Sequence, residues 1–157
     1  MNSSFRDMVE SLHPKLVLLM AHVPASNGSV APDMPQRGVY LFTENGTHLY
    51  VGRSNRMHSR YVQHCRVSSL PNMAGFAFRL AREATGVPAG NYGPGNEGSA
   101  GVLMRNESFV AAFREAKDRV RRMEFRYVEE RDPTRQALLE IYCAVALDAK
   151  HNSFENH

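Results

Sequence analysis

The sequence feature that most constrains the fold is a pair of short β-rich runs on either side of Asn45-Gly46. The first run is Gly38-Val-Tyr-Leu-Phe-Thr, and the second is Thr47-His-Leu-Tyr-Val-Gly. An Asn-Gly pair between two such runs is the strongest local signal for a β-hairpin, because both residues tolerate the positive φ angles of the turn. The sequence therefore predicts two paired antiparallel strands, with Tyr40 on the first and Tyr50 on the second.

Helices are predicted on both sides of this hairpin from the spacing of apolar residues. The expected helical segments are residues 3–22, as one or two helices capped by Ser3 or Ser4 and bent at Pro14, then 55–67, 72–85 and about 106–119. Alternation over residues 123–128 predicts a third strand, and Asp132-Pro133 opens a last helix that runs to about Asp148. This order predicts an α+β fold with a small antiparallel sheet.

Two segments have the composition of loops. Residues 23–36 contain three prolines and no apolar periodicity, which is typical of a linker or surface loop. Residues 86–101 hold six of the chain's eleven glycines, which indicates a mobile insertion. These glycines are not followed by Lys and Ser or Thr in the order that a phosphate-binding P-loop requires.

Composition argues against a membrane span, an exported protein and a cysteine-based metal site. No apolar run approaches the roughly eighteen residues of a membrane span. The first ten residues carry Asp7 and Glu10 where a signal peptide has positive charge. Cys65 and Cys143 form no C-x-x-C pair and are expected to be core residues. These features predict a protein of a reducing compartment, the cytoplasm.

The basic residues are concentrated and are mostly arginine. The formal net charge is +3, and 16 of the 19 basic residues are arginine. Between Arg37 and Arg82, seven arginines stand against one acid, Glu44. Arginine forms forked hydrogen bonds to phosphate, so this segment indicates a polyanionic partner. A solvated basic surface would have the same composition.

The helix expected after the hairpin has two distinct rows of side chains at i, i+4 spacing. The cationic row is Arg56, Arg60 and His64, and the apolar row is Met57, Tyr61 and Cys65. The spacing therefore predicts a helix with one face in the core and one face toward phosphate.

Glu140 is the only charged residue between Ala137 and Leu147. A carboxylate among apolar neighbours needs a partner or a metal ion, unless it lies at an exposed edge or pairs with an arginine for structural reasons. One hard oxygen ligand suffices for Mg²⁺, which keeps several waters. A base for the attacking water would come from Tyr40, Tyr50 or His64, and the sequence leaves open which one.

Together these residues resemble the GIY-YIG nuclease superfamily in order and spacing. The resemblance starts with Gly38-Val39-Tyr40, followed ten residues on by Tyr50-Val51-Gly52 and then by Ser54, Arg60 and His64. It continues with Glu140 and with Asn152 twelve positions later. Both tripeptides have valine where the family usually has isoleucine. The resemblance covers residues 37–154.

The resemblance implies a three-stranded antiparallel sheet flanked by helices, and hydrolysis of phosphodiester bonds in DNA, or in RNA, with one Mg²⁺ or Mn²⁺. It implies that Glu140 binds the metal, that Arg60 contacts the scissile phosphate, and that Tyr40 and Tyr50 position or activate water with help from His64. The expected nucleic-acid contacts are Arg53, Ser54, Arg56, Arg60 and Arg66. Gly38, Gly52 and Asn152 would support the site.

The resemblance to the nuclease family also suggests a domain organisation and several biological settings. Residues 37–157 would form the nuclease domain, with an insertion at about 70–118, and residues 1–36 would be a helical extension and linker. Target choice would come from the N-terminal helices, the insertion or a partner. A restriction or phage-defence enzyme is favoured, with a repair nuclease or a non-catalytic nucleic-acid-binding module as alternatives. The N-terminal helices are a candidate contact for a homo-oligomer.

Overall fold

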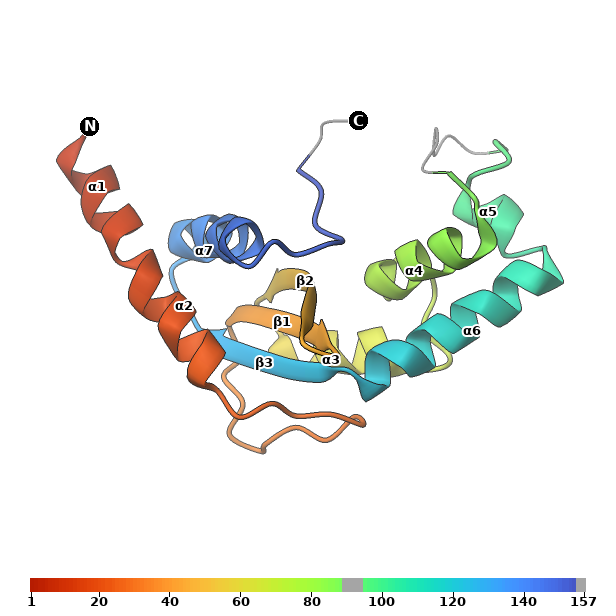
Figure 1. Cartoon of the computed structure of the whole chain (residues 1–157), viewed down its shortest axis with the longest axis horizontal. Helices are drawn as coiled ribbons and strands as arrows, with labels where there is room; N and C mark the ends of the chain where they lie inside the picture. Colours follow the sequence, from red (N-terminus) through yellow and green to blue (C-terminus); the bar gives the residue numbers. More distant parts are fainter. Residues whose placement is uncertain (89–94, 155–157) are drawn as a thin grey trace. The chain divides into compact units, whose positions relative to one another are not determined.

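The computed structural model describes residues 1–88 and 95–154, and these form an α+β fold (Figure 1). A three-stranded antiparallel sheet has the order β2-β1-β3. The strands are β1 (Gly38–Glu44), β2 (Thr47–Ser54) and β3 (Glu124–Glu129). The helices are α1 (Ser3–Glu10), α2 (Leu12–Ala21), α3 (Met57–Cys65), α4 (Gly75–Thr85), α5 (Ala100–Leu103), α6 (Glu107–Arg122) and α7 (Pro133–Ala146). Within the described ranges, no helix has the length and apolarity needed to cross a bilayer.

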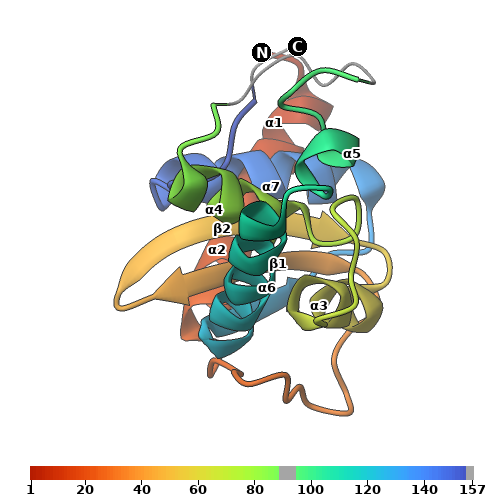
Figure 2. The ribbon, with the colours of Figure 1, turned by 90° about the vertical axis from the view of Figure 1, so that its right-hand side faces the viewer.

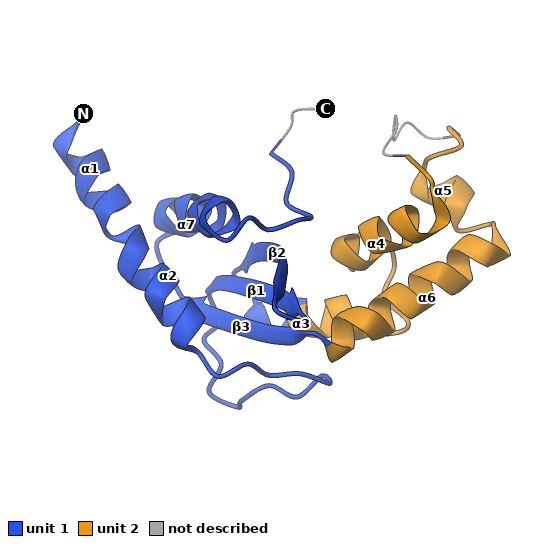
Figure 3. Cartoon of the chain, viewed as in Figure 1, with its two compact units in different colours: residues 1–60, 123–157 blue, residues 61–122 orange. Residues whose placement is uncertain are grey.

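The chain divides into two compact units (Figure 3). Unit 1 comprises residues 1–60 and 123–157, and unit 2 comprises residues 61–122. The N-terminal segment belongs to the same unit as the sheet, and unit 2 has wider bounds than the insertion expected at about 70–118. Part of the predicted Gly-rich insertion, residues 89–94, and the last three residues of the predicted nuclease domain lie outside the described residues.

The hairpin forms as its turn residues predict. Asn45 and Gly46 have φ angles of 50° and 78°, both in the left-handed region that a tight hairpin turn requires. Tyr40 lies opposite Gly52, and Tyr50 lies opposite Phe42. The register shifts between Phe42 and Thr43, which is a bulge or irregularity in the pairing.

The two faces of the sheet have different chemistry. One face joins α2 and α7 in a single buried cluster, whose aliphatic members are Leu12, Leu16, Leu19, Val39, Leu41, Val51, Val128 and Leu139. The other face carries aromatic rings, with Phe42 at 5.8 Å from Tyr40 and 5.0 Å from Phe125 between ring centroids. Because α2 supplies three buried leucines, it is part of the core of unit 1 and not a separate extension.

The N-terminal helices begin and break at positions other than those predicted. Asn2, and not Ser3 or Ser4, caps α1 by accepting a hydrogen bond from the Phe5 amide. The break between α1 and α2 falls at Ser11, whereas the sequence suggested a bend at Pro14. The reason is that Pro14 lies in the first turn of α2, where its missing N–H costs no helical hydrogen bond.

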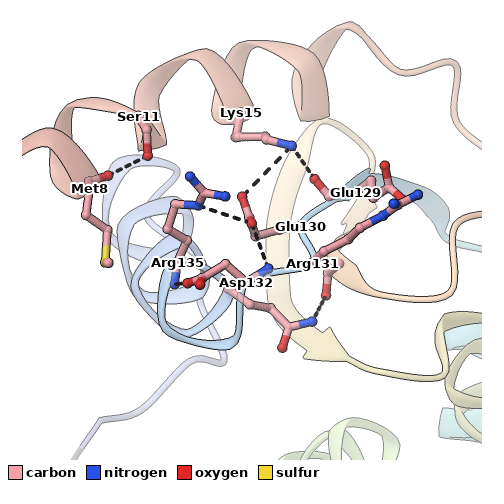
Figure 4. Close-up of polar contacts among 10 residues, drawn as sticks. Met8, Ser11, Lys15, Glu129, Glu130, Arg131, Asp132 and Arg135 are labelled. Atoms are coloured by element: carbon pink, nitrogen blue, oxygen red, sulfur yellow. Dashed lines mark hydrogen bonds and ion pairs between the residues drawn. The ribbon is translucent and has the colours of Figure 1, made fainter.

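A buried carboxylate holds α2 to the start of α7 (Figure 4). The Glu130 side chain is 4% exposed, and its Oε1 accepts hydrogen bonds from Arg135 Nε at 3.3 Å and from the Asp132 amide at 3.0 Å. Lys15 lies 3.9 Å from Glu130 Oε2 and donates a 2.6 Å hydrogen bond to the Glu129 carbonyl. Asp132 caps α7 and Pro133 is its first residue, as the sequence predicts.

Unit 2 is built around α4 and α6, which pack against each other (Figure 2). The Phe78 ring centroid lies 5.2 Å from that of Phe109 and 5.7 Å from that of Phe113. Two of its cations are buried: Arg82 donates to the carbonyls of Pro88 and Gly98, and Lys117 to those of Val67 and Ser69. Arg82 is therefore a structural residue and does not contribute to the positive surface that the sequence suggested.

Candidate functional site

Six of the residues expected to carry the chemistry line one pocket in unit 1. This hollow of about 370 Å³, here called the Glu140 pocket, is lined by Tyr40, Tyr50, Arg53, Ser54, Asn55, Arg60, Gln136 and Glu140. The residues come from β1, β2, the connection that follows it, α3 and α7. Positions up to 100 residues apart in the sequence therefore meet at one place.

Two larger hollows do not gather these residues. One, of about 530 Å³, lies between α4 and α6 in unit 2, and its polar lining mixes acids with Arg119 and Arg122. The other, of about 720 Å³, is lined in unit 1 by residues of the loop before β1, by the last residue of β3 and by Arg131 just after it. Neither contains a tyrosine, so the smaller Glu140 pocket is the better candidate for the predicted chemistry.

Gly52 makes room for the ring of Tyr40. A Cβ atom at Gly52 would lie 2.3 Å from the Tyr40 hydroxyl oxygen and 2.4 Å from the adjacent ring carbon, so only glycine fits opposite this ring. The Tyr40 side chain is 1% exposed, and Arg60 Nε donates a long 3.4 Å hydrogen bond to its hydroxyl. The pair of strands thus presents the Tyr40 hydroxyl beside the Arg60 guanidinium.

The environment of Tyr40 keeps its hydroxyl protonated. Burial is the main cause that raises the pKa of Tyr40 well above its ordinary value, and the neighbouring Tyr50 adds to the rise. The charge of Arg60 and its hydrogen bond act in the opposite direction without cancelling it. At neutral pH the Tyr40 hydroxyl therefore keeps its proton and can donate a hydrogen bond.

Glu140 has an arginine partner in the pocket. Arg53 Nε donates a 2.9 Å hydrogen bond to Glu140 Oε2, and the two side chains are 46% and 23% exposed. Burial raises the pKa of Glu140 above its ordinary value, while the hydrogen bond and charge of Arg53 lower it. The carboxylate is therefore only partly compensated, as expected for a group that can accept a further cation.

Sequence reasoning missed two residues of the pocket, Gln136 and Asn55. The Gln136 side chain is 2% exposed, and its Nε2 donates to the Ser54 carbonyl at 3.0 Å, the Gly38 carbonyl at 3.3 Å and Asn55 Oδ1 at 3.3 Å. These bonds join the start of β1 and the end of β2 to α7. The available signal was spacing, because Gln136 precedes Glu140 by one helical turn and shares its face.

Asn152 supports β2 by imitating a neighbouring strand. Its side-chain oxygen accepts from the Val51 amide and its side-chain nitrogen donates to the Val51 carbonyl, both at 2.8 Å. Just before it, the His151 amide donates to the Leu49 carbonyl at 2.8 Å. The segment after α7 therefore occupies the outer edge of the strand that carries Tyr50. Gly38 supports the other side of β1, since a Cβ there would lie 2.1 Å from the Val128 carbonyl oxygen.

Of the residues predicted to act in catalysis or to contact nucleic acid, Arg56, His64 and Arg66 are not among those lining the Glu140 pocket. Arg56 is exposed just before α3, and its amide donates to Ser54 Oγ at 2.9 Å. Arg66 is exposed in unit 2. His64 is 0% exposed, so the prediction that it faces outward in a row with Arg56 and Arg60 is wrong. His64 is buried next to Cys65, so the buried face of α3 is wider than the expected row of Met57, Tyr61 and Cys65, which is itself buried.

The donor set of the pocket fits a single Mg²⁺ or Mn²⁺ ion. Residues 1–88 and 95–154 contain no cluster of three or more His, Cys, Asp or Glu side chains that could hold a metal by themselves. Glu140 is the one carboxylate among the residues that line the pocket, and its neighbours carry oxygen atoms in hydroxyl and amide groups. Mg²⁺ binds in this way, through one or two carboxylates, with waters and substrate phosphate completing its shell.

Comparisons with known proteins identified no relative of this chain. A scan against models of protein families found no match, and searches of curated proteins and of solved structures found no significant match either. The α+β class of the chain and the geometry of the Glu140 pocket rest on its own residues.

Proposed function

We propose that this chain is a metal-dependent endonuclease of the GIY-YIG type that hydrolyses phosphodiester bonds in DNA. The observation that carries this proposal is the Glu140 pocket, in which two tyrosines, two arginines and one carboxylate from β1, β2, α3 and α7 meet. A basic and an acidic group beside hydroxyl groups suit hydrolysis of a phosphate ester better than recognition alone. The order and spacing of the same residues in the sequence support the proposal independently.

The arginines of the pocket would bind the scissile phosphate. Arg60 is half-buried next to the Tyr40 hydroxyl, so its charge lies where charge develops on the phosphate oxygens in the transition state. Arg53 has only its Nε engaged by Glu140 among the described residues, which leaves its two terminal nitrogens to form a fork with phosphate. Tyr40, which keeps its proton, would donate a hydrogen bond to a phosphate oxygen or to the attacking water.

Glu140 would hold the metal. When bound, a Mg²⁺ or Mn²⁺ ion would polarise the phosphodiester and stabilise the leaving oxygen. For this, the carboxylate must be deprotonated and must share its oxygens with Arg53. An Arg53 side chain drawn toward substrate phosphate would free Glu140 Oε2 for the metal.

The proposal also addresses which residue helps the attacking water. The high pKa of Tyr40 argues against a tyrosinate at that position. Tyr50 is half-buried, lines the pocket and lies 6.3 Å from Tyr40 between ring centroids, so it is the better-placed tyrosine to orient water. His64, the other candidate from the sequence, is buried and does not line the pocket.

The proposal is tested by incubating the purified chain with plasmid, single-stranded and structured DNA or RNA, in Mg²⁺, Mn²⁺ or EDTA. We expect cleavage that needs the metal and that Glu140→Gln lowers by about 10²–10³-fold, the size of effect expected when transition-state charge stabilisation is removed. Glu124→Gln is the matched control, because Glu124 also pairs with an arginine, Arg126 at 3.0 Å, but outside the pocket. Cleavage that survives Glu140→Gln would contradict the proposal.

The second candidate is a nucleic-acid-binding module of the same fold without turnover. The observation that favours it is the ion pair, since Glu140 has a cationic partner in Arg53 without any metal. Such a module would bind nucleic acid with a steep dependence on salt and would cut under no metal condition. The cleavage assay, run beside a binding titration at two salt concentrations, separates the two candidates.

A further inference from the structure

We infer that the amide oxygen of Gln136 is a second oxygen ligand for the divalent metal, next to Glu140. The inference rests on the proposed function, and it adds a residue that the resemblance to the nuclease family does not supply. It assigns Gln136 two simultaneous tasks, with the nitrogen holding the strand ends and the oxygen turned to the metal.

Gln136 and Glu140 share one face of α7. They are separated by four residues, which is slightly more than one turn, so their side chains lie one above the other. Both line the Glu140 pocket. Two oxygen-bearing side chains at i, i+4 on a helix can therefore reach one small ion without any movement of the backbone.

The hydrogen bonds of Gln136 determine which way its amide points. All three partners of Nε2 are oxygen atoms: two backbone carbonyls and Asn55 Oδ1. A flipped amide would set its own oxygen against the two carbonyl oxygens, which can only accept, and would break those hydrogen bonds. The nitrogen is therefore committed to the strand ends, and Oε1 is the polar atom that remains for the pocket.

Oε1 of Gln136 is the accessible acceptor of this side chain. The side chain is 2% exposed and lines the Glu140 pocket, and within the described part of the chain Oε1 accepts no hydrogen bond, although Nε2 has three acceptors. Oε1 is not among the buried polar atoms that lack a partner, so it keeps enough exposed surface to meet water or a cation. Amide oxygens are hard ligands suited to Mg²⁺ and Mn²⁺.

A neutral second ligand also fits the charge of the pocket. Glu140 is the only acid among the lining residues, and Arg53 and Arg60 are both cationic. A second carboxylate at position 136 would form ion pairs with these arginines. A neutral amide oxygen is not attracted to them in this way and stays available to bind the metal ion. Glu140 would then attract the metal ion by its charge, and Gln136 would fix where the ion binds.

The test measures metal binding directly, without turnover. Mn²⁺ binding to the full chain is followed by electron paramagnetic resonance, and Cd²⁺ is added to displace the Mn²⁺ that depends on Glu140. Gln136→Met keeps the length of the side chain and replaces the hard oxygen by a soft thioether. We expect Mn²⁺ affinity to fall about tenfold and Cd²⁺ affinity to fall much less, so that the ratio of the two changes.

Two further variants complete the comparison. Gln36→Met is the matched control, because Gln36 is exposed and does not line the Glu140 pocket; it should leave both affinities unchanged. If Gln136→Met fails to fold, Gln136→His takes its place, with a shift of preference from Mn²⁺ toward Zn²⁺ as the expected result. The cysteines should not interfere, because burial raises the pKa of Cys65 to about 11 and that of Cys143 to about 12.

The outcomes separate this inference from the proposed function. An equal fall of Mn²⁺ and Cd²⁺ affinity in Gln136→Met would show that Gln136 acts only by holding the strand ends, and would overturn the inference even if Glu140-dependent cleavage is observed. Mn²⁺ binding that is the same in the wild type and in Glu140→Gln would overturn the inference together with the metal role of Glu140. A changed Mn²⁺ to Cd²⁺ ratio confined to Gln136 variants supports it.

Discussion

At the scale of single residues, the contact between Tyr40 and Gly52 is the most demanding feature of the Glu140 pocket. The ring occupies the space that any side chain at position 52 would take. We expect Gly52→Ala to push the ring away from Arg60, to cost about 1–3 kcal/mol of stability through overpacking, and to lower cleavage strongly. Thermal unfolding and the cleavage rate measure both effects. Gly75→Ala is the control, because no atom lies within 4 Å of a Cβ there, and an equal effect at both glycines would contradict the prediction.

The pair of Arg53 and Glu140 predicts how cleavage depends on pH. Since Arg53 lowers the pKa of a carboxyl that burial raises, Arg53→Gln should raise the Glu140 pKa further. A protonated carboxyl cannot hold the metal, so the acidic limb of the pH profile should move to higher pH in the variant. Arg56→Gln, which removes an arginine outside the pocket, should leave the limb in place. A limb that stays fixed in Arg53→Gln would mean that another group titrates there.

The raised pKa of Glu140 in the wild type also affects how the stability of the fold depends on pH. The folded state holds the Glu140 proton more tightly than the unfolded chain, so the associated stability is present at low pH and is lost as the pH rises through the folded-state pKa. Glu140→Gln should therefore raise the melting temperature at pH 7 relative to the wild type, and by less at pH 4. Melting curves of the two proteins at both pH values measure the difference.

At the scale of elements, α1 and α2 differ in what they contribute. No residue of α1 is buried, whereas α2 places three leucines in the core. Two neighbouring leucines make a matched pair of variants, because Leu19 is 0% exposed and Leu18 is 57% exposed. Leu19→Ala should cost about 2–5 kcal/mol of the free energy of unfolding, through reduced burial and a cavity, and Leu18→Ala well under 1 kcal/mol. Urea denaturation measures both, and similar effects would show that α2 is not part of the core.

The edge of β2 shows how an element outside the sheet can complete it. The segment from Lys150 to Asn152 bonds to the backbone of β2 at residues 48, 49 and 51. An uncovered edge strand exposes unpaired backbone groups, and this segment satisfies them beside Tyr50. Asn152 thereby acts on the pocket through the strand and not by entering it.

At the scale of the whole molecule, charge is distributed unevenly between the two units. Residues 61–122 hold nine Arg and Lys residues against five Asp and Glu residues, whereas the rest of the chain has ten against eleven. Exposed Arg114 and Arg121 lie seven positions apart on α6, which is two helical turns, and therefore on one face. If the proposed function holds, we expect unit 2 to supply most of the general electrostatic attraction of nucleic acid.

This distribution predicts the salt dependence of binding. The double variant Arg114→Gln and Arg121→Gln should bind DNA more weakly, and the slope of log affinity against log salt should fall by about two, because each arginine that neutralises a phosphate adds roughly one to the slope. The control is Arg6→Gln with Lys150→Gln, two exposed cations of unit 1. Equal changes in slope for both double variants would show that α6 has no special part in binding.

Features that depend only on residues adjacent in the sequence, such as turns and helix ends, were determined by the sequence itself. The Asn45-Gly46 turn, the Asp132-Pro133 start of α7 and the end of α4 before Gly86 all follow from the φ angles and hydrogen bonds that these residues favour locally. The three strands and the α+β class follow from the apolar spacing between such signals. The family of the chain, its reaction and its metal remain predictions from the same sequence.

Only the tertiary structure decided which distant side chains meet. It paired Glu140 with Arg53 across 87 residues, buried His64, brought Gln136 against the ends of β1 and β2, and placed α2 in the core. The physical reason is that helical or strand periodicity indicates which residues share a face, but not which face of another element covers them. That choice depends on how all the elements of a unit pack together, and here it decides the partner of the carboxylate on which the proposed chemistry depends.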